Sequence, residues 1–336
     1  MFSFASCGVD EVEQAARAAE SAFHIYRNLD GKTIGVFLNT IADEIEALGD
    51  QLLDVCDSET ALGQARLTGE RGRTCGQLRA FAELVTRGEW VQASIDTAIP
   101  DRAPVPKPDL RRMMRPIGPV AVFGASNFPF AFSTLGGDTA SALAAGNPVI
   151  VKGHPAHPAT SELFAHAINR AIEKCDIPAG VFSLLQGLGN DLGTDLVKHP
   201  VVQAVGFTGS ERGGRALMDI AAARLQPIPV YAEMGSINPL FVGPNTLEAQ
   251  AESIATGLSG SVCMGTGQFC TSPGIVVSVA SEVFETTLKN RLSETPRGYL
   301  LNPQIAASLQ ASLESLNDHP QLEWLNRADF EASSMT

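Results

Sequence analysis

Three side chains in this 336-residue chain have types and settings that could take part in catalysis. Cys270 lies in the glycine-rich segment G-T-G-Q-F-C-T (265–271), where backbone N–H groups would favour its thiolate. Glu233 ends a short apolar run ahead of Gly235 and could act as a general base. Asn127 follows another apolar run and could direct its amide into a crevice. Each also has an ordinary interpretation, as a small buried thiol, a solvated carboxylate and a turn-forming asparagine respectively.

Two further segments carry groups that suit a nucleotide. Lys152 follows the apolar run 149–151 and could reach ribose hydroxyls or phosphates, although an isolated surface lysine is the commoner case. Gly209 and Ser210 lie in F-T-G-S-E-R-G-G, which ends at Gly214, follows a predicted strand and opens a helix. Free N–H groups at a helix start, with glycines that allow close approach, form a phosphate cradle. The segment is neither G-x-G-x-x-G nor a P-loop, so a plain turn and helix cap explains it equally well.

Composition narrows the classes of partner. The chain has 24 Lys and Arg against 37 Asp and Glu, a net charge of −13, which disfavours nucleic acid and an anionic membrane surface as partners. The longest uncharged stretch, 116–137, is interrupted by prolines and glycines, so it is not expected to cross a membrane. With 44% hydrophobic and 18% charged residues, the sequence predicts a globular fold.

Histidines and cysteines give no sign of a metal site or a disulfide framework. His154 and His157 form an H-x-x-H in a proline-rich loop, without a carboxylate ligand or the helical H-E-x-x-H pattern, so we expect no metal. The six cysteines are spread along the chain without a C-x-x-C pair, which favours reduced thiols. No basic segment followed by an apolar run opens the sequence. We therefore expect no secretory signal and a cytoplasmic location.

The elements that must position these residues follow an α/β pattern. Apolar periodicity predicts helices at 10–28, 31–57 and about 76–87, and the proline-rich stretch 95–112 predicts an extended arm. After residue 115, short apolar runs alternate with helical stretches, which is typical of βαβ units and a parallel sheet covered on both faces. The expected strands are 120–123, 149–151, 181–185, 201–207, 230–233 and 275–279. One expected helix ends near residue 146, and three others span 160–174, 191–198 and 249–261.

The order of the motifs along the chain resembles the aldehyde dehydrogenase superfamily from end to end. The matching segments are N-F-P at 127–129, V-K at 151–152, F-T-G-S at 207–210, E-M-G at 233–235 and G-Q-x-C at 267–270. Further segments look most like α-ketoglutaric semialdehyde (2,5-dioxovalerate) dehydrogenases and related NADP-linked enzymes. These are E-T at 59–60, G-E-R-G-R-T at 69–74, N-F-P-F-A-F-S at 127–133 and G-G-D-T-A-S-A-L at 136–143.

The resemblance implies a role for each candidate residue. Cys270 would be the nucleophile that forms a thiohemiacetal and then a thioester, with the Asn127 amide stabilising the oxyanion. Glu233 would activate the hydrolytic water. Lys152 would hold the adenosine ribose, while Gly209 and Ser210, at the start of the helix that contains Gly214, would face the pyrophosphate. The implied activity is NAD(P)-dependent oxidation of a small aldehyde, such as 2,5-dioxopentanoate, by a homo-oligomer when full length.

The implied organisation has three parts: a helical part with an extended arm at 1–112, a Rossmann-like NAD(P)-binding domain at 113–234, and a partial catalytic domain at 235–336. Pro155 occupies the position, three residues after Lys152, where NAD-preferring members have a glutamate, which predicts a preference for NADP. No E-x-F-G-P segment follows Cys270, so the chain resembles a C-terminally truncated member. A non-catalytic dinucleotide-binding fragment is the alternative. A cysteine hydrolase fits worst, because no histidine lies near Glu233 or Cys270 in sequence.

Overall fold

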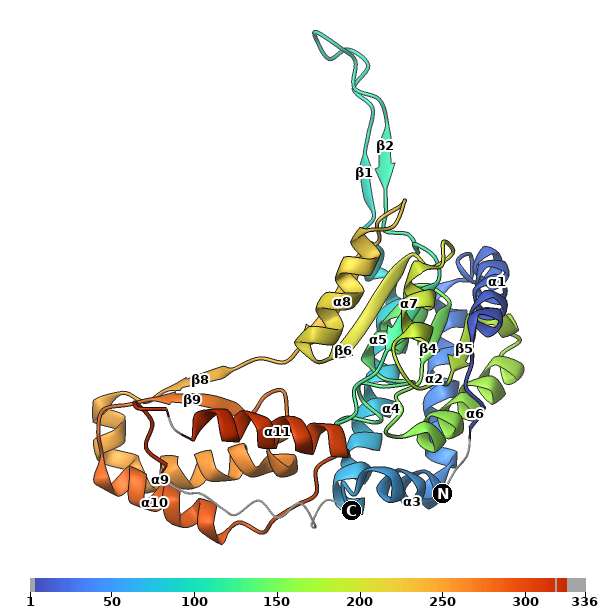
Figure 1. Ribbon diagram of the computed structural model, residues 1–336. Coiled ribbons are helices and arrows are strands. Elements are labelled where there is room, and N and C mark those ends of the chain that lie inside the picture. Colours follow the sequence, from blue (N-terminus) through green and yellow to red (C-terminus); the bar gives the residue numbers. More distant parts are fainter. Residues whose placement is uncertain (1–3, 318, 325–336) are drawn as a thin grey trace. The chain divides into compact units, whose positions relative to one another are not determined.

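A computed structural model describes residues 4–317 and 319–324 (Figure 1). The chain divides into two compact units, Met1–Met234 and Gly235–Thr336, and each is considered by itself. Within the described residues, no helix combines the length and the apolar composition needed to cross a membrane.

The first unit begins with four helices: α1 (Val9–Tyr26), α2 (Gly31–Ala47), α3 (Gly49–Thr60) and α4 (Gln64–Arg87). The prediction of one helix over 31–57 was wrong, because Gly49 has a φ of +57° and separates α2 from α3. The predicted start of α4 near residue 76 was also wrong. Its first turns bury Glu70 and Thr74 beside Leu67, so the apolar periodicity is broken there although the backbone is helical.

An antiparallel hairpin follows α4 and the short 3₁₀ turn Glu89–Val91. Strands β1 (Ser94–Asp96) and β2 (Leu110–Arg112) pair, and an isolated bridge joins Ile99 to Lys107 farther along the same hairpin. The extended arm expected over 95–112 is therefore present.

A five-stranded parallel sheet forms the centre of the first unit, which confirms the predicted α/β class. Its order is β5-β4-β3-β6-β7, and its crossover helices lie between consecutive strands. The strands are β3 (Val120–Phe123), β4 (Val149–Lys152), β5 (Phe182–Leu185), β6 (Ala204–Gly209) and β7 (Val230–Met234). The helices are α5 (Gly137–Ala144), α6 (Pro158–Lys174), α7 (Asp191–Lys198) and α8 (Glu211–Ala222).

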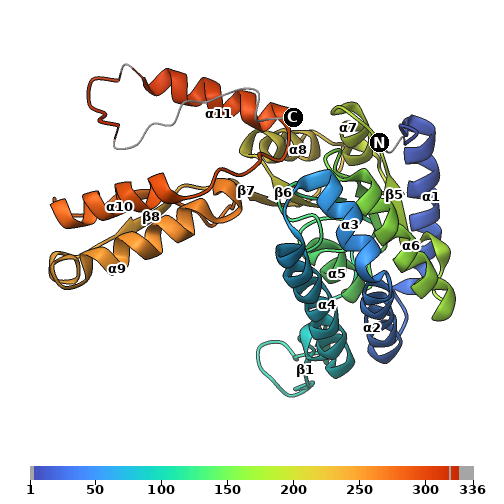
Figure 2. The same ribbon diagram turned by 90° about the horizontal axis from the view of Figure 1, so that it is seen from below.

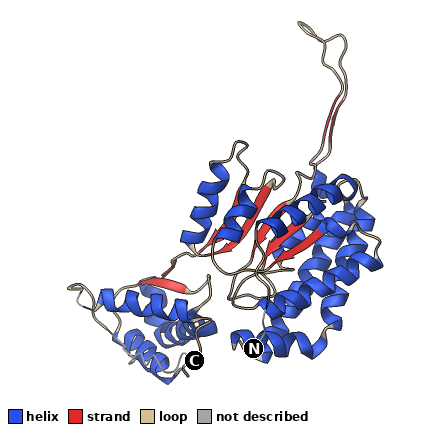
Figure 3. Cartoon of the chain, turned by 45° about the vertical axis from the view of Figure 1, so that its right-hand side comes forward, coloured by secondary structure: helices blue, strands red, loops and turns tan. Residues whose placement is uncertain are grey.

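Helices cover both faces of this sheet (Figures 2 and 3). Alternate residues of β3 enter different cores: Val120 and Val122 pack with α2, α4, α5 and α6, whereas Ala121 and Phe123 pack with α1, α7 and α8. Strands buried on both faces read as continuous apolar runs, which explains why the sequence located β3 and β4 accurately.

The second unit contains β8 (Asn238–Phe241), α9 (Pro244–Cys263), β9 (Pro273–Val277), α10 (Glu282–Glu294) and α11 (Pro303–Leu316). Strands β8 and β9 are parallel, and α9 and α10 pack together around Leu247, Ala255 and Phe284. The sequence predicted α9 and β9 approximately but not β8, α10 or α11. Amphipathicity in α10 is slight: among its residues only Phe284 is buried.

Candidate active site

Four candidate residues of the first unit lie at or just beyond the carboxyl ends of neighbouring strands: Asn127 after β3, Lys152 on β4, Ser210 after β6 and Glu233 on β7. Phe123 of β3 pairs with Lys152 of β4 on one side and with Phe207 of β6 on the other, so these strands finish at one edge. Their order places the topological switch point between β3 and β6, where parallel α/β sheets bind ligands.

The loop after β3 carries Asn127 and is anchored by α4. The backbone N–H groups of Phe130 and Ala131 donate to Glu70 Oε1 at 2.8 and 3.0 Å, and the guanidinium of Arg66 donates to the Asn127 carbonyl. Glu70 is buried, and burial raises the pKa of its carboxyl against the lowering effects of those two N–H groups and of nearby arginines. Sequence reasoning missed Glu70 and Arg66, since the loop lies about 60 residues farther along the chain.

Lys152 is half-buried, and burial lowers the pKa of its ammonium. Pro155, three residues later, is exposed. Two histidines of the same loop, His154 and His157, stack with ring centroids 5.3 Å apart. His157 Nε2 lies 3.1 Å from the carbonyl oxygen of Ala125, in the loop after β3. Burial lowers the pKa of both rings, that of His154 to about 3. The histidines therefore join the loop after β4 to the loop after β3, and no group of three metal-binding side chains occurs among the described residues.

The loop after β6 leads directly into α8. Ser210 caps the helix by accepting a hydrogen bond from the Gly213 N–H at 3.2 Å. A Cβ on Gly209 would lie 2.7 Å from the Phe207 ring, and a Cβ on Gly214 would lie 2.6 Å from the sulfur of Met234. The helix start therefore packs closely on Phe207 and Met234, and a larger residue at either glycine would force one of these side chains to shift.

The same helix start has room for an anion. The N–H groups of Glu211 and Arg212 have no acceptor among residues 4–317 and 319–324, as expected for a first helical turn, and Ser210 itself is exposed. Amides of this kind, at the same edge of the sheet as Lys152 but separated from its strand β4 by β3, suit the pyrophosphate of a dinucleotide. The residues present therefore fit NAD or NADP.

Glu233 lies on β7 opposite Thr208 of β6, with its side chain exposed. A second carboxyl, that of Asp138, lies in the first turn of α5. Its pKa is raised mainly by its burial and also by the negative charge of Glu233. Gly206 makes room for Asp138, because a Cβ there would lie 3.1–3.2 Å from three atoms of the Asp138 side chain. Sequence reasoning missed Asp138, although an acidic residue at a helix start was a visible signal.

Cys270 belongs to the second unit, where it is half-buried in the turn before β9. The side-chain amide of Asn238 donates to the carbonyl oxygens of Cys270 at 2.7 Å and Ser272 at 3.0 Å. Gln268 Oε1 accepts from the Leu301 N–H at 2.9 Å. The preceding segment Met264–Gly267 turns sharply, with Gly265 and Thr266 both at a φ of +58°. Asn238 and Gln268 thus fix the cysteine loop by side-chain bonds that the sequence did not reveal.

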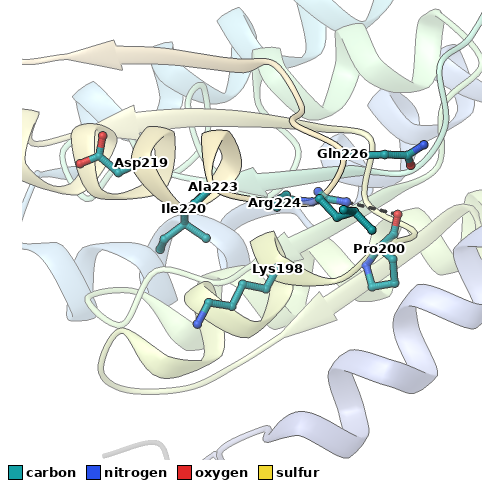
Figure 4. Close-up of a pocket in the computed structure, with 8 residues that line it drawn as sticks. Lys198, Pro200, Asp219, Ile220, Ala223, Arg224 and Gln226 are labelled. Carbon is teal, nitrogen blue, oxygen red and sulfur yellow. Dashed lines mark hydrogen bonds between the residues drawn. The ribbon is translucent and has the colours of Figure 1, made fainter.

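A surface pocket lies elsewhere on the first unit, at the carboxyl ends of α7 and α8 (Figure 4). Arg224 donates to the carbonyl oxygens of Val197, Pro200 and Val202 there, which closes one side of the pocket. These loops precede β6 and β7, so the pocket is at the edge opposite to Lys152 and Ser210 and contributes nothing to the candidate site.

Comparison with known proteins identifies the family. The model of the aldehyde dehydrogenase family matches residues 1–314 of the chain. The chain belongs to the aldehyde dehydrogenase family. The resemblance drawn from the strand-end motifs and the G-Q-x-C segment is confirmed.

Two similar relatives are both named as semialdehyde dehydrogenases. "Alpha-ketoglutaric semialdehyde dehydrogenase 2" of Azospirillum brasilense is 53% identical over 313 residues, which are 92% of this chain and 60% of the relative. "Alpha-ketoglutaric semialdehyde dehydrogenase" of Acinetobacter baylyi is 47% identical over 94% of this chain and 60% of the relative. The chain therefore spans about 60% of the length of the curated relatives it matches.

Solved structures share the fold. HpcC from Thermus thermophilus superimposes with a TM-score of 0.78 at 26% identity, over 93% of this chain and 59% of that one. A NAD-dependent benzaldehyde dehydrogenase from Corynebacterium glutamicum gives a TM-score of 0.80 at 20% identity, over 97% and 70%. An Escherichia coli structure described as an NADP dependent enzyme gives 0.78 at 24% identity, over 92% and 63%. Both cofactors thus occur with this fold.

Proposed function

We propose that this protein catalyses NAD(P)-dependent oxidation of a short semialdehyde, with 2,5-dioxopentanoate as the favoured substrate and NADP as the favoured cofactor. The observation that carries the proposal is the 53% identity with an α-ketoglutaric semialdehyde dehydrogenase over 92% of the chain. Because the chain spans 60% of that relative, activity of the chain alone is part of what must be tested.

In this proposal the thiolate of Cys270 attacks the aldehyde carbon and forms a thiohemiacetal. The Asn127 amide and the Cys270 N–H donate to the oxyanion. NAD(P), held by Lys152 and the first turn of α8, would supply the hydride acceptor, and Cys270 would then carry a thioester. Glu233 then takes a proton from water, whose oxygen attacks the thioester, releasing the carboxylate and the free thiol.

The elements already described explain how these groups would be held. Glu70 and Arg66 fix the loop of Asn127, and Asn238 fixes the carbonyl of Cys270. Lys152 and the first turn of α8 would bind the ribose and the pyrophosphate. Exposed Pro155 places no carboxylate near a 2′-phosphate, which supports NADP as the preferred cofactor.

Two substitutions test the catalytic assignments. Cys270→Ser should abolish reduction of the cofactor at 340 nm while changing cofactor affinity no more than a few fold, because an alkoxide is far harder to form than a thiolate. Cys263→Ser, in the same unit and also half-buried, is the matched control and should retain activity. Unchanged turnover in Cys270→Ser would remove this cysteine from the mechanism.

Glu233→Gln should preserve a rapid burst of reduced cofactor but slow the following turnover, because only thioester hydrolysis needs the base. Loss of the burst would instead assign Glu233 to activation of the thiol. Cofactor binding without oxidation of any semialdehyde would favour the alternative, a dinucleotide-binding fragment.

Two features of the setting belong to the proposal as well. The six cysteines all have free thiols, which suits a reducing cytoplasm. We also propose that the full-length protein is a homo-oligomer, which sedimentation analysis of that protein would test.

A further inference from the structure

Two arginines of α4 stack on aromatic rings of the loop that carries Asn127. The guanidinium carbon of Arg66 lies 4.9 Å from the centre of the Phe128 ring, and that of Arg73 lies 4.7 Å from the centre of the Phe132 ring. Arg73 is also 5.9 Å from the Phe128 ring, and the two rings meet edge to face at 5.3 Å. All four side chains therefore form one cluster, the arginine–phenylalanine cluster.

The cluster is positively charged in a protein whose net charge is −13. The carboxyl of Glu70 lies close to both guanidinium groups: its Oε2 is 3.8 Å from Arg66 Nη2, and the charges of Arg66 and Arg73 both act to lower its pKa. Glu70 already accepts two backbone N–H groups, and burial raises the pKa of its carboxyl. Neutralisation of both arginines by Glu70 is therefore incomplete, and the cluster retains at least one positive charge.

The guanidinium of Arg73 is accessible to a ligand. Its side chain is exposed, and it makes no hydrogen bond or ion pair with any residue of the described chain. A guanidinium that lies over a ring can keep N–H groups at its edge for a ligand, where they match the two oxygens of a carboxylate. Stacking on Phe132 thus orients the donors without engaging them.

The position of the cluster relates it to the reacting end of a substrate. Phe128 directly follows Asn127 in the chain, and Arg66 donates to the Asn127 carbonyl oxygen. The arginines are therefore held against the same short loop that carries Asn127, within the span of a small ligand bound at that loop. A short semialdehyde carries the aldehyde at one end and an anionic carboxylate at the other.

We propose that Arg73, supported by Arg66 and oriented by the rings of Phe128 and Phe132, binds the distal carboxylate of a semialdehyde substrate. Arg66 is a positioning residue in this arrangement, since it holds the Asn127 loop and stacks on Phe128. The inference rests on the proposed function and assigns substrate selectivity to named residues: anionic semialdehydes are selected over uncharged aldehydes of the same chain length.

The first test compares succinic semialdehyde and 2,5-dioxopentanoate with butanal and pentanal in the full chain. Arg73→Met should lower kcat/KM for the two semialdehydes about tenfold or more, mainly through KM, because a hydrogen bond to a charged group is lost. Values for butanal and pentanal should stay within about twofold. Arg87→Met, which removes an exposed arginine of the same helix, is the matched control and should alter neither class. Equal losses for charged and uncharged aldehydes would overturn the proposal.

The second test does not depend on turnover. Calorimetric titration with 2-oxoglutarate, which carries the same keto acid end, should show binding to wild type and to Arg87→Met, with at least tenfold weaker binding to Arg73→Met. Arg73→Lys should recover part of the affinity, as a cation without the planar fork. Equal affinity in wild type and Arg73→Met, or no binding to wild type, would refute the carboxylate site. If no aldehyde reduces the cofactor while this binding pattern holds, the proposed function fails and the anion site stands.

Discussion

Glu70 offers a direct measurement of how strongly α4 holds the loop that presents Asn127. Its Oε1 accepts the N–H groups of Phe130 at 2.8 Å and Ala131 at 3.0 Å, and both residues are buried. Glu70→Ala leaves two buried donors without an acceptor. Each unsatisfied group costs about 1–3 kcal/mol, so the gross loss is roughly 2–6 kcal/mol.

Two effects offset part of that loss. The substitution removes a carboxylate whose pKa burial raises, so at pH 7 it also removes the cost of keeping that group ionised in the folded state. Water can enter the space left by the side chain and pair with one donor. We therefore expect Glu70→Ala to lower the free energy of unfolding by about 3 kcal/mol. Glu70→Gln keeps an acceptor oxygen and should cost about 1 kcal/mol or less.

Urea unfolding followed by circular dichroism gives the free energies, and native-state hydrogen exchange locates the effect. Exchange of the Phe130 and Ala131 amides should accelerate strongly in Glu70→Ala and little in Glu70→Gln. Glu83→Ala, at an exposed position of α4, is the control and should change stability by less than about 1 kcal/mol. A Glu70→Ala protein as stable as wild type, with both amides still protected, would refute the anchoring role.

Three further predictions concern the carboxyl edge of the sheet. Titration of both cofactors should show NADP binding about tenfold more tightly than NAD, and Pro155→Glu should reverse that order by repelling the 2′-phosphate; tighter binding of NAD by wild type would contradict the argument. Burial lowers the pKa of His154 from 6.5 to about 3 in the folded protein. Between these two pH values the unfolded chain binds a proton at this histidine and the folded protein does not. The free energy of unfolding should therefore fall by about 1.4 kcal/mol for each pH unit below 6.5. Urea unfolding at several pH values should show a smaller slope in His154→Asn; an equal slope would mean that His154 titrates normally. Asp138→Asn should raise the melting temperature at pH 7 but not at pH 3, because the raised pKa of Asp138 means that its ionised form is unfavourable in the folded state. An unchanged melting temperature at pH 7 would show that the carboxylate is well solvated.

Much of the first unit was predictable because its central strands β3 and β4 are buried on both faces. Val120–Phe123 and Val149–Lys152 are short apolar runs, and the alternation of such runs with helices is distinctive. Helix α4 was predicted only from its second half. Its first half buries Glu70 and Thr74, and polar residues on a buried face look like loop residues until their partners are known.

The candidate site divides in the same way. The predicted residues Lys152 and Ser210 lie at aligned strand ends, because parallel strands in register finish together whatever their side chains. The roles assigned to Lys152 and Ser210 remain predictions, as do those assigned to Asn127, Glu233 and Cys270. Arg66 could not be recognised beforehand, since its partners Asn127 and Phe128 are distant in the chain and stacking on a ring leaves no mark in spacing or composition.

The helix that holds the loop of Asn127 is also the helix that carries the proposed selectivity. Arg66, Glu70 and Arg73 are spaced by four and three residues, so they occupy one face of α4. Glu70 accepts from the loop backbone while the two arginines stack on the rings that the same loop displays. Loss of Glu70 would therefore move the rings that orient the arginines as well as the loop that bears Asn127. In the proposed arrangement, one helix face therefore serves both purposes: Glu70 mainly supports the stability of the loop, and Arg73 mainly supports recognition of a substrate carboxylate.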